Sequence, residues 1–472
     1  MAGEVSGLVF SRLLSADAQG RLIPDLAARV PSLTNGGVLD GGRMIRYRLR
    51  PGVVWQDGKP LTAADVVFTY DAVMNPQTPV PSHFGYDRIA SVRADGPLTV
   101  VVRLKQPFSP ILSEFFGPDS NYPILPRHLL ARYGSLAHVP FNQAPIGSGP
   151  YRVATWAHGD YVRYVANDRY YGGMPHIREI VTKFIPNEQT ILSQLETGEI
   201  DATFNGDTSL FRAYTHLSGY RILVNPLNGT GLLVLNTSTG ALHDVLVRRA
   251  IAAAIDTMQI ARLSTDGVDS SRDAARGLFS YADDPSVAWT HYDPARAKRL
   301  LSRAGFESKR LTVELGYLAG EPSLESASLL IEQGLGAVGV RAELKSYYAS
   351  AVFPMLQSGH FQMALIPTYA PNDPDTSWFW DCNEIPPGGF NLSRYCDPTI
   401  DALSREGAST FDIARRVVLY RQVERLAALA APVVVLWRSR EIDVVPTALH
   451  GYPAGEALQS YAQVQNWYLS RR

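Results

Sequence analysis

One stretch of the chain, residues 46–74, sets out a strand, two turns and a helix in a fixed order. The pair Pro51-Gly52 makes the first turn, and Trp55 ends the short extended run that follows it. Thr62 is suited to cap the helix, because its hydroxyl can accept a hydrogen bond from a free N–H of the first turn. Asp65, three residues later, favours the same start because a carboxylate is stabilised at a helix N-terminus. The stretch therefore predicts an element of a fold, and it contains no catalytic set of residues.

The chain has 472 residues, enough for about three domains or two large lobes. Apolar residues make up 46% of it, which can supply packed cores, and the net charge is −1. A nearly neutral chain without a basic block is not suited to nucleic acid or an anionic membrane as its main partner. The longest weakly polar run, residues 426–437, is broken by Pro432 and is shorter than the ~20 residues of a membrane span. We expect this run to be a buried helix end followed by a buried strand.

Strand-like and helical segments alternate irregularly, with many turns, as the 38 glycines and 32 prolines indicate. This pattern predicts mixed α/β lobes rather than a bundle or a sandwich. Three blocks can be distinguished, at residues 14–145, 146–236 and 237–445. The predicted strands are 99–104, 161–165, 180–184 and 433–437, and the predicted helices are 188–195, 244–255, 412–429 and one that follows Asp293-Pro294 and stops at Gly305.

The two cysteines, Cys382 and Cys396, have 13 residues between them, including a Pro-Pro-Gly-Gly segment that can reverse the chain. In an exported protein a disulfide here would contribute roughly 3 kcal/mol by restricting the unfolded state. Two unrelated buried thiols, or half of a metal site, are the alternatives. A structural zinc site usually needs four clustered nitrogen or sulfur ligands, and no histidine lies between or close to this pair. A disulfide is therefore favoured.

The sequence contains no phosphate-binding loop, zinc-protease helix or nucleophile elbow. Ser148 lies in a Gly-Ser-Gly turn without an evident base, and the ten histidines are scattered without a metal-binding spacing. Asp373 and Asp375 could imitate the carboxylate pair of a glycosidase, although both lie in a proline-containing turn, where aspartate is expected for backbone reasons. We expect that the protein is not an enzyme and that it binds no cofactor and no metal. The alternative is a hydrolase that uses Asp373 and Asp375.

Seven segments, in order, resemble the signatures of family 5 extracellular solute-binding proteins, the peptide- and nickel-type receptors of ABC importers. One of them, Gly-Ser-Gly-Pro-Tyr at residues 147–151, is similar to the family's G-(TS)-G-(PA)-Y. Each segment alone is a weak signal, whereas their shared order along nearly the whole chain is specific. The matching segments are residues 21–27, 46–74, 147–151, 195–202, 247–256 and 292–305, and a late signature made of residues 373–375, Asn391 and residues 397–403.

The resemblance implies an α/β fold, a two-lobe clamp of the type II periplasmic-binding-protein kind with an extra domain on the first lobe. Lobe I would be discontinuous, built from residues 1–13, 146–236 and 446–472, with residues 14–145 as the extra domain and 237–445 as lobe II. A small solute would bind between lobes that close by hinge motion, and would be delivered to ABC permease subunits in the membrane. We expect a monomer in the periplasm or at the outer face of the cytoplasmic membrane.

The N-terminal region shows no export signal before an amphipathic segment at residues 5–14. Composition alone allows an exported or a cytoplasmic protein, and the resemblance implies export. The family normally has a strand and a Leu-Asp-Pro segment ahead of the region that matches residues 5–14. A chain without that part would lack one strand of lobe I.

The ligand site is where this sequence departs from the family's peptide-binding members. They often carry an aspartate, three residues before an Asp-Pro pair, that binds the α-ammonium of a peptide, and this chain has Ala370 there. A buried ammonium without a carboxylate is costly, so we expect modified or blocked peptides and other amphipathic solutes ahead of free peptides, sugars or opines, and metal chelates. Nearby aromatic residues suit an apolar or sugar-like face, with core packing as the alternative for Trp378 and Trp380. The expected ligand-binding residues are Tyr122, Phe204, Asn205, Asn236, Thr368, Tyr369, Asp373, Trp378 and Trp380.

Overall fold

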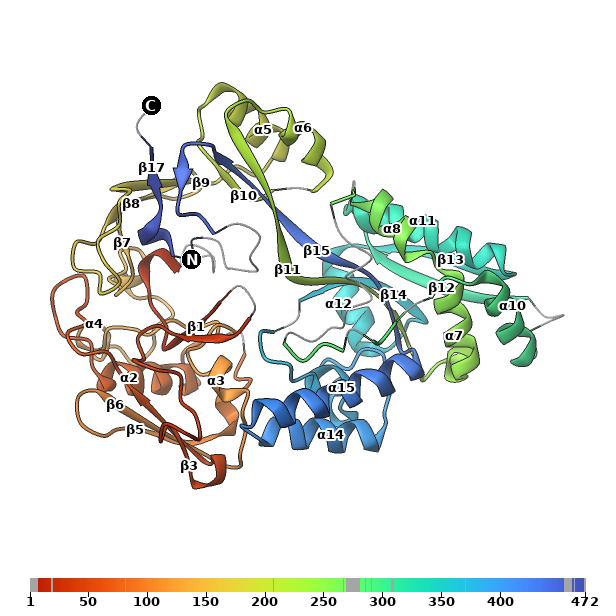
Figure 1. Cartoon of the computed structure of the whole chain (residues 1–472), viewed down its shortest axis with the longest axis horizontal. Helices are drawn as coiled ribbons and strands as arrows, with labels where there is room; N and C mark the ends of the chain where they lie inside the picture. Colours follow the sequence, from red (N-terminus) through yellow and green to blue (C-terminus); the bar gives the residue numbers. More distant parts are fainter. Residues whose placement is uncertain are drawn as a thin grey trace.

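Two long strands connect two bodies of the protein and cross from one to the other (Figure 1). They are β11 (Tyr220–Leu235) and β15 (Val433–Pro446), and they pair antiparallel. The predicted two-lobe arrangement of mixed α/β structure is confirmed. The computed structural model describes residues 7–17, 20–80, 82–206, 208–265, 267–268, 281–284, 286–289, 291–306, 310–369, 371–453, 461 and 463–470.

A six-stranded mixed sheet fills the second body and reaches into the first, in the order β10-β15-β11-β14-β12-β13. Its other strands are β10 (Thr203–Gly206), β12 (Leu311–Leu318), β13 (Val340–Tyr347) and β14 (Met363–Tyr369). Along β11, Leu233 and Leu235 enter one hydrophobic core, while Leu232 and Val234 enter another. This alternation follows from the strand, whose neighbouring side chains point to opposite faces. Both faces of the sheet are therefore buried in this body.

Helices cover each face of this sheet (Figure 1). One face carries α7 (Val245–Ala254), α8 (Thr257–Ser264), α10 (Pro294–Arg303) and α11 (Pro322–Ala337), and the other carries α12 (Ala349–Ser358), α13 (Ser377–Trp380), α14 (Pro398–Ser409) and α15 (Ile413–Ala430). The three helices predicted in this part of the chain are confirmed. Asp244 caps α7 by accepting the N–H of Leu246 at 2.8 Å, and Asp412 caps α15 by accepting that of Arg415 at 3.1 Å.

The 14–145 block contains an antiparallel sheet in the order β3-β4-β6-β5. Its elements are β1 (Leu14–Ala16), β2 (Leu22–Pro24), β3 (Val38–Leu39), β4 (Met44–Arg48), α2 (Ala63–Met74), β5 (Ile89–Ala94), β6 (Thr99–Leu104), α3 (Ile111–Glu114) and α4 (Arg127–Leu130). The predicted start of α2 is confirmed, because Asp65 accepts the N–H of the N-cap residue Thr62 at 2.8 Å. The second oxygen of Asp65 accepts the N–H of Arg127 at 2.9 Å, which ties α4 to α2.

The rest of the first body combines the 146–236 block with both ends of the described chain. Its elements are β7 (Tyr151–Ala157), β8 (Tyr161–Ala166), β9 (Glu179–Lys183), α5 (Glu188–Thr197), α6 (Phe211–Thr215), β16 (Leu449–His450) and β17 (Tyr468–Leu469). The strands predicted at 99–104, 161–165 and 180–184 appear as β6, β8 and β9, with ends within one residue. In one core, Leu8 packs with Tyr164 of β8 and with Trp467 near the C-terminus. Segments far apart in the sequence therefore share one interior.

The pairing of β11 and β15 is irregular between the two bodies. Pro226 pairs with Arg440 and Thr230 with Arg438, so four residue steps on β11 face two on β15. On one side of this register break, β15 packs in a small core with α5 and α6, and on the other side it contributes to the two cores of the second body.

The weakly polar run at residues 426–437 divides, as predicted, into the end of α15 and the beginning of β15. The strand predicted at 433–437 continues to Pro446, because it crosses into the first body. Among the helices of the described residues, none combines the length and the apolar character that a membrane span requires.

Candidate functional site

The two bodies touch where Asp119 of the 14–145 block meets the turn after β14. The carboxylate of Asp119 accepts the backbone N–H of Asn372 at 2.8 Å, its side-chain amide at 2.7 Å and the N–H of Asp373 at 3.2 Å. Burial raises the pKa of Asp119, and the hydrogen bonds from Asn372 act in the opposite direction. This carboxylate therefore holds a turn that lies more than 250 residues further along the chain.

A second contact joins the same blocks at the end of α14. The N–H of Ser109 donates to the carbonyl oxygen of Ala408 at 2.6 Å, and the Ser109 hydroxyl donates to the same oxygen at 3.1 Å. Phe411 lies against Gly42, where a Cβ atom would come within 2.7 Å of the ring. We call these contacts, together with those of Asp119, the interlobe junction.

Asp373 is held by Arg416 of α15 in a buried, two-pronged ion pair. The two guanidinium nitrogens of Arg416 lie 2.9 and 2.6 Å from the two carboxylate oxygens, and the side chains are 6% and 8% exposed. Arg416 also donates to the carbonyl oxygen of Gly407 at 3.0 Å and to the hydroxyl of Tyr281 at 2.8 Å. Such a bidentate pair fixes geometry as well as charge, so it holds the turn at residues 371–377 on α15.

Asp375 lies in the same turn and is also buried. Its carboxylate accepts the N–H of Ser377 at 3.1 Å and the Ser377 hydroxyl at 2.9 Å. Burial, and then the charge of Asp373, raise the pKa of Asp375 to about 6. Both aspartates therefore shape the turn from within, through bonds to the protein itself.

An apolar pocket of about 280 Å³ opens at the end of β14. Phe353 and Phe390 flank it with ring centroids 6.2 Å apart, and they are 50% and 49% exposed. The predicted ligand-binding residues Thr368 and Trp378 both line it. Its full lining consists of Leu318, Val352, Phe353, Leu356, Leu365, Ile366, Pro367, Thr368, Trp378, Phe379, Phe390 and Leu392.

A smaller polar cavity of about 170 Å³ lies on the other side of the interlobe junction, in the 14–145 block. The predicted residue Tyr122 lines it, and so does Asp119, whose carboxylate reaches the turn after β14. The full lining consists of Ser82, Phe84, Tyr86, Glu114, Asp119, Ser120, Asn121 and Tyr122.

Two of the remaining predicted residues, Asn236 and Trp380, line neither of these hollows. The side-chain amide of Asn236 donates to the carbonyl oxygens of Gly359 and Phe361 at 3.0 and 2.9 Å. Trp380 is fully buried and stacks on Trp289 with centroids 6.1 Å apart.

Phe204 and Asn205 lie on β10 in the first body. Phe204 stacks on Tyr452 with centroids 5.6 Å apart, and the N–H of Asn205 donates to Asp443 at 3.1 Å. Tyr369 ends β14, where it pairs with Gly229 of β11. Ala370, on which the ligand argument depended, lies outside the described residues.

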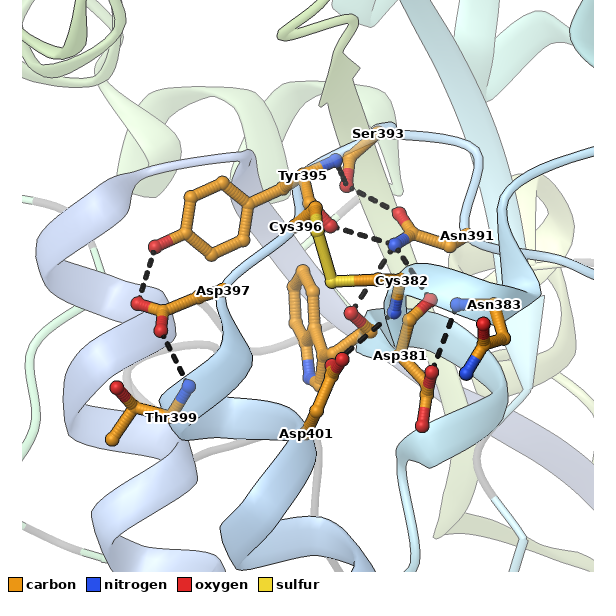
Figure 2. Close-up of a disulfide and its surroundings, with 11 residues drawn as sticks. Asp381, Cys382, Asn383, Asn391, Ser393, Tyr395, Cys396, Asp397, Thr399 and Asp401 are labelled. Atoms are coloured by element: carbon orange, nitrogen blue, oxygen red, sulfur yellow. Dashed lines mark hydrogen bonds between the residues drawn. A yellow bond between two sulfur atoms is a disulfide. The ribbon is translucent and has the colours of Figure 1, made fainter.

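The predicted disulfide between Cys382 and Cys396 is confirmed (Figure 2). It lies beside Asn391, whose amide donates to the carbonyl oxygens of Trp380 and Asp381 at 3.2 Å and of Tyr395 at 2.7 Å. The half-metal-site alternative is wrong, because the two sulfurs bond to each other. Within the part of the chain that the structure describes, no group of three or more His, Cys, Asp or Glu side chains could hold a metal ion.

Sequence reasoning missed Glu114, Asp119, Phe353 and Phe390, which line the two hollows, and Arg416, which holds Asp373. Glu114 and Asp119 come from a proline-punctuated region without a distinctive motif. The partners of Asp119 lie in another block, so no spacing in the sequence could connect them. For Arg416, the signal would have been a charged residue on the apolar side of an amphipathic helix.

Comparisons with known proteins agree with this architecture. The family model described as bacterial extracellular solute-binding proteins, family 5 Middle, matches residues 21–385. Protein XP55 of Streptomyces lividans is 28% identical over 455 residues, which cover 90% of this chain and 77% of that protein. The oligopeptide-binding protein AppA of Bacillus subtilis is 24% identical over 486 residues, which cover 99% of this chain and 87% of that protein.

Among solved structures, the ABC transporter substrate-binding protein CtaP of Listeria monocytogenes has the same fold. It superposes with a TM-score of 0.87 at 22% identity, covering 99% of this chain and 94% of that one. The matched family consists of solute-binding proteins and not of enzymes, so the hydrolase alternative built on Asp373 and Asp375 finds no support. The chain belongs to the bacterial extracellular solute-binding proteins of family 5, the substrate-binding components of ABC importers.

Proposed function

We propose that this protein captures an amphipathic solute, such as a peptide or a modified peptide, beside the interlobe junction and delivers it to its ABC permease. In this proposal residues 146–236 and both ends of the chain form lobe I, residues 14–145 form an extra domain on it, and residues 237–445 form lobe II. The protein works as a monomer, in the periplasm or at the outer face of the cytoplasmic membrane.

The observation that carries this proposal is the position of the apolar pocket. Thr368 lines the pocket and lies four residues before Asn372, which Asp119 binds from the other block. Four residues of chain span at most ~14 Å, so Thr368 lies within about that distance of the place where the two blocks meet. A solute held there contacts lobe II while the junction closes the lobes beside it.

The character of the pocket supports an apolar group on the solute. Aromatic rings of Phe353, Trp378 and Phe390 line it, and such rings bind apolar groups over a large contact area. AppA, the relative from Bacillus subtilis, is named an oligopeptide-binding protein, which favours a peptide-like solute. The carboxylate of Asp373 is engaged by Arg416, which favours peptides whose amino terminus is blocked or bound elsewhere.

The test is a thermal-shift screen of the purified protein against free peptides, N-acetylated peptides, opines, glycosides and metal chelates. We expect apolar blocked peptides to raise the melting temperature by several degrees through preferential binding to the folded state. Native mass spectrometry of freshly purified protein should show one bound solute per chain.

Two variants connect the binding to the pocket. Phe353→Ala removes a half-exposed ring from its rim and should weaken binding about tenfold. Val418→Ala removes a comparably exposed side chain from α15, outside the pocket lining, and should leave binding unchanged. If no solute shifts the melting temperature and none is carried through purification, the proposal is wrong.

A further inference from the structure

The polar cavity next to the interlobe junction has a fixed aromatic wall. Phe84, Tyr86 and Tyr122 contribute three rings to its lining. A hydrogen bond of 3.0 Å joins the hydroxyls of Tyr86 and Ser120, and the Tyr122 hydroxyl donates to the carbonyl oxygen of Ser82. Tyr86 and Tyr122 meet edge to face, with centroids 5.4 Å apart. The wall is therefore in place before any solute arrives.

Glu114 lines the same cavity as Asp119, but the two carboxylates differ in their hydrogen bonding. Asp119 uses both carboxylate oxygens to accept N–H groups of Asn372 and Asp373. The Glu114 carboxylate has no hydrogen bond or ion pair with any described residue, and its side chain is partly buried. Its stem lies against Gly85, where a Cβ atom would come within 2.9 Å of the Glu114 Cβ. A glycine at this position leaves the room in which the Glu114 side chain lies.

Several acidic side chains lie around Glu114. Burial, and after it the charges of Asp119, Asp373 and Asp375, raise the pKa of Glu114 to about 9. Among these acids, Asp373 is neutralised by Arg416, whereas Asp119 accepts neutral N–H groups of this turn. A positively charged group in the cavity would favour the ionised form of Glu114.

We propose that the polar cavity binds a cationic group of the transported solute, an ammonium or a guanidinium, with Glu114 as its counter-ion. Aromatic faces attract cations, and a carboxylate adds a charge-assisted hydrogen bond. The inference rests on the proposed function, because it names one charged group of the solute proposed there. The carboxylate for that group comes from the 14–145 block.

The experiment uses pentylammonium chloride as the cationic probe and 1-pentanol as the uncharged probe of the same chain length. NMR titrations of the full chain at constant ionic strength measure both affinities. We expect saturable binding of pentylammonium at least about tenfold tighter than binding of pentanol. Glu114→Gln keeps the shape, removes the charge and should abolish this preference. Glu384→Gln changes a partly buried glutamate outside the cavity lining and should preserve it.

A proton count separates an ion pair from a neutral hydrogen bond. Glu114 must ionise when it pairs with the cation, so binding near pH 7 should release a proton that Glu114→Gln does not release. Calorimetry in two buffers with different ionisation enthalpies measures this release.

Three results would overturn the inference: no binding of pentylammonium to the wild type, equal binding of the two probes, or unchanged selectivity in Glu114→Gln. They leave the proposed function intact if neutral blocked peptides still raise the melting temperature of the wild type. Conversely, selective pentylammonium binding without a response to any larger solute would support the cation site and contradict the proposed function.

Discussion

The carboxylate of Asp119 accepts the backbone N–H of Asn372 at 2.8 Å, although the two residues belong to different blocks of the chain. Asp119→Ala would leave that N–H and the N–H of Asp373 without their acceptor and would weaken the interlobe junction. We expect the bodies to separate, with a rise of roughly 1 Å in the radius of gyration measured by solution X-ray scattering. Asp40→Ala, at an exposed site of the same block, is the control. Equal radii for the three proteins would contradict this role of Asp119.

Arg416 and its neighbour Arg415 form ion pairs in opposite environments. The side chains of Arg416 and its partner Asp373 are 6% and 8% exposed. Those of Arg415 and its partner Glu406 are 51% and 50% exposed. Arg416→Met leaves a buried carboxylate without its partner and should lower the free energy of unfolding by ~3–5 kcal/mol. Arg415→Met should change it by less than ~0.5 kcal/mol. Urea denaturation compares the two, and similar losses would refute the distinction.

The bond between Cys382 and Cys396 closes a loop with a sequence separation of 14. Replacing both cysteines by serine should lower the free energy of unfolding by roughly 3 kcal/mol, because the unfolded chain regains freedom. Urea denaturation with and without reductant measures this change. Reductant should destabilise the wild type and have no effect on the double variant; insensitivity of the wild type would count against the bond.

The protonation of Glu114 should make stability depend on pH. Its pKa rises from 4.5 in the unfolded chain to about 9 in the folded protein, so the folded state holds the proton more tightly. The protonated carboxyl therefore contributes to the free energy of unfolding. This contribution is fully present below pH 4.5 and is lost as the pH rises towards 9. Glu114→Gln imitates the protonated form and removes this dependence.

We therefore expect the free energy of unfolding of Glu114→Gln, relative to that of the wild type, to increase with pH. Denaturation at pH 5, 7 and 8.5 should show a total increase of more than ~1 kcal/mol. Asp375, with a pKa raised to about 6, contributes a loss of the same sign in both proteins and cancels in the difference. Glu179→Gln, at an exposed site, is the control. A constant difference between Glu114→Gln and the wild type would refute the argument.

Local signals in the sequence predicted local structure well. The start of α2 depends on Thr62 and on Asp65, three residues later, so the sequence contains all that it needs. The disulfide could be predicted because a turn-forming segment lies between two cysteines that have no other partner.

The candidate site was harder to predict because its parts come from distant segments. Asp119 acts on Asn372, and Glu114 acquires its character from burial and from Asp373 and Asp375. Neither effect leaves a trace in the spacing of residues. Thr368 and Trp378 were predicted for the ligand site and lie together at the apolar pocket, and their binding role stays a prediction.

The register break in β11 and β15 affects how the two bodies can move. Opposite Pro226 to Thr230 the partner strand advances only from Arg440 to Arg438, so the strands cannot keep a regular ladder of hydrogen bonds there. Interrupted pairing bends more easily than a regular ladder. A rotation of one body against the other can therefore be taken up within a few peptide units, while the packed interiors on either side keep their side-chain contacts.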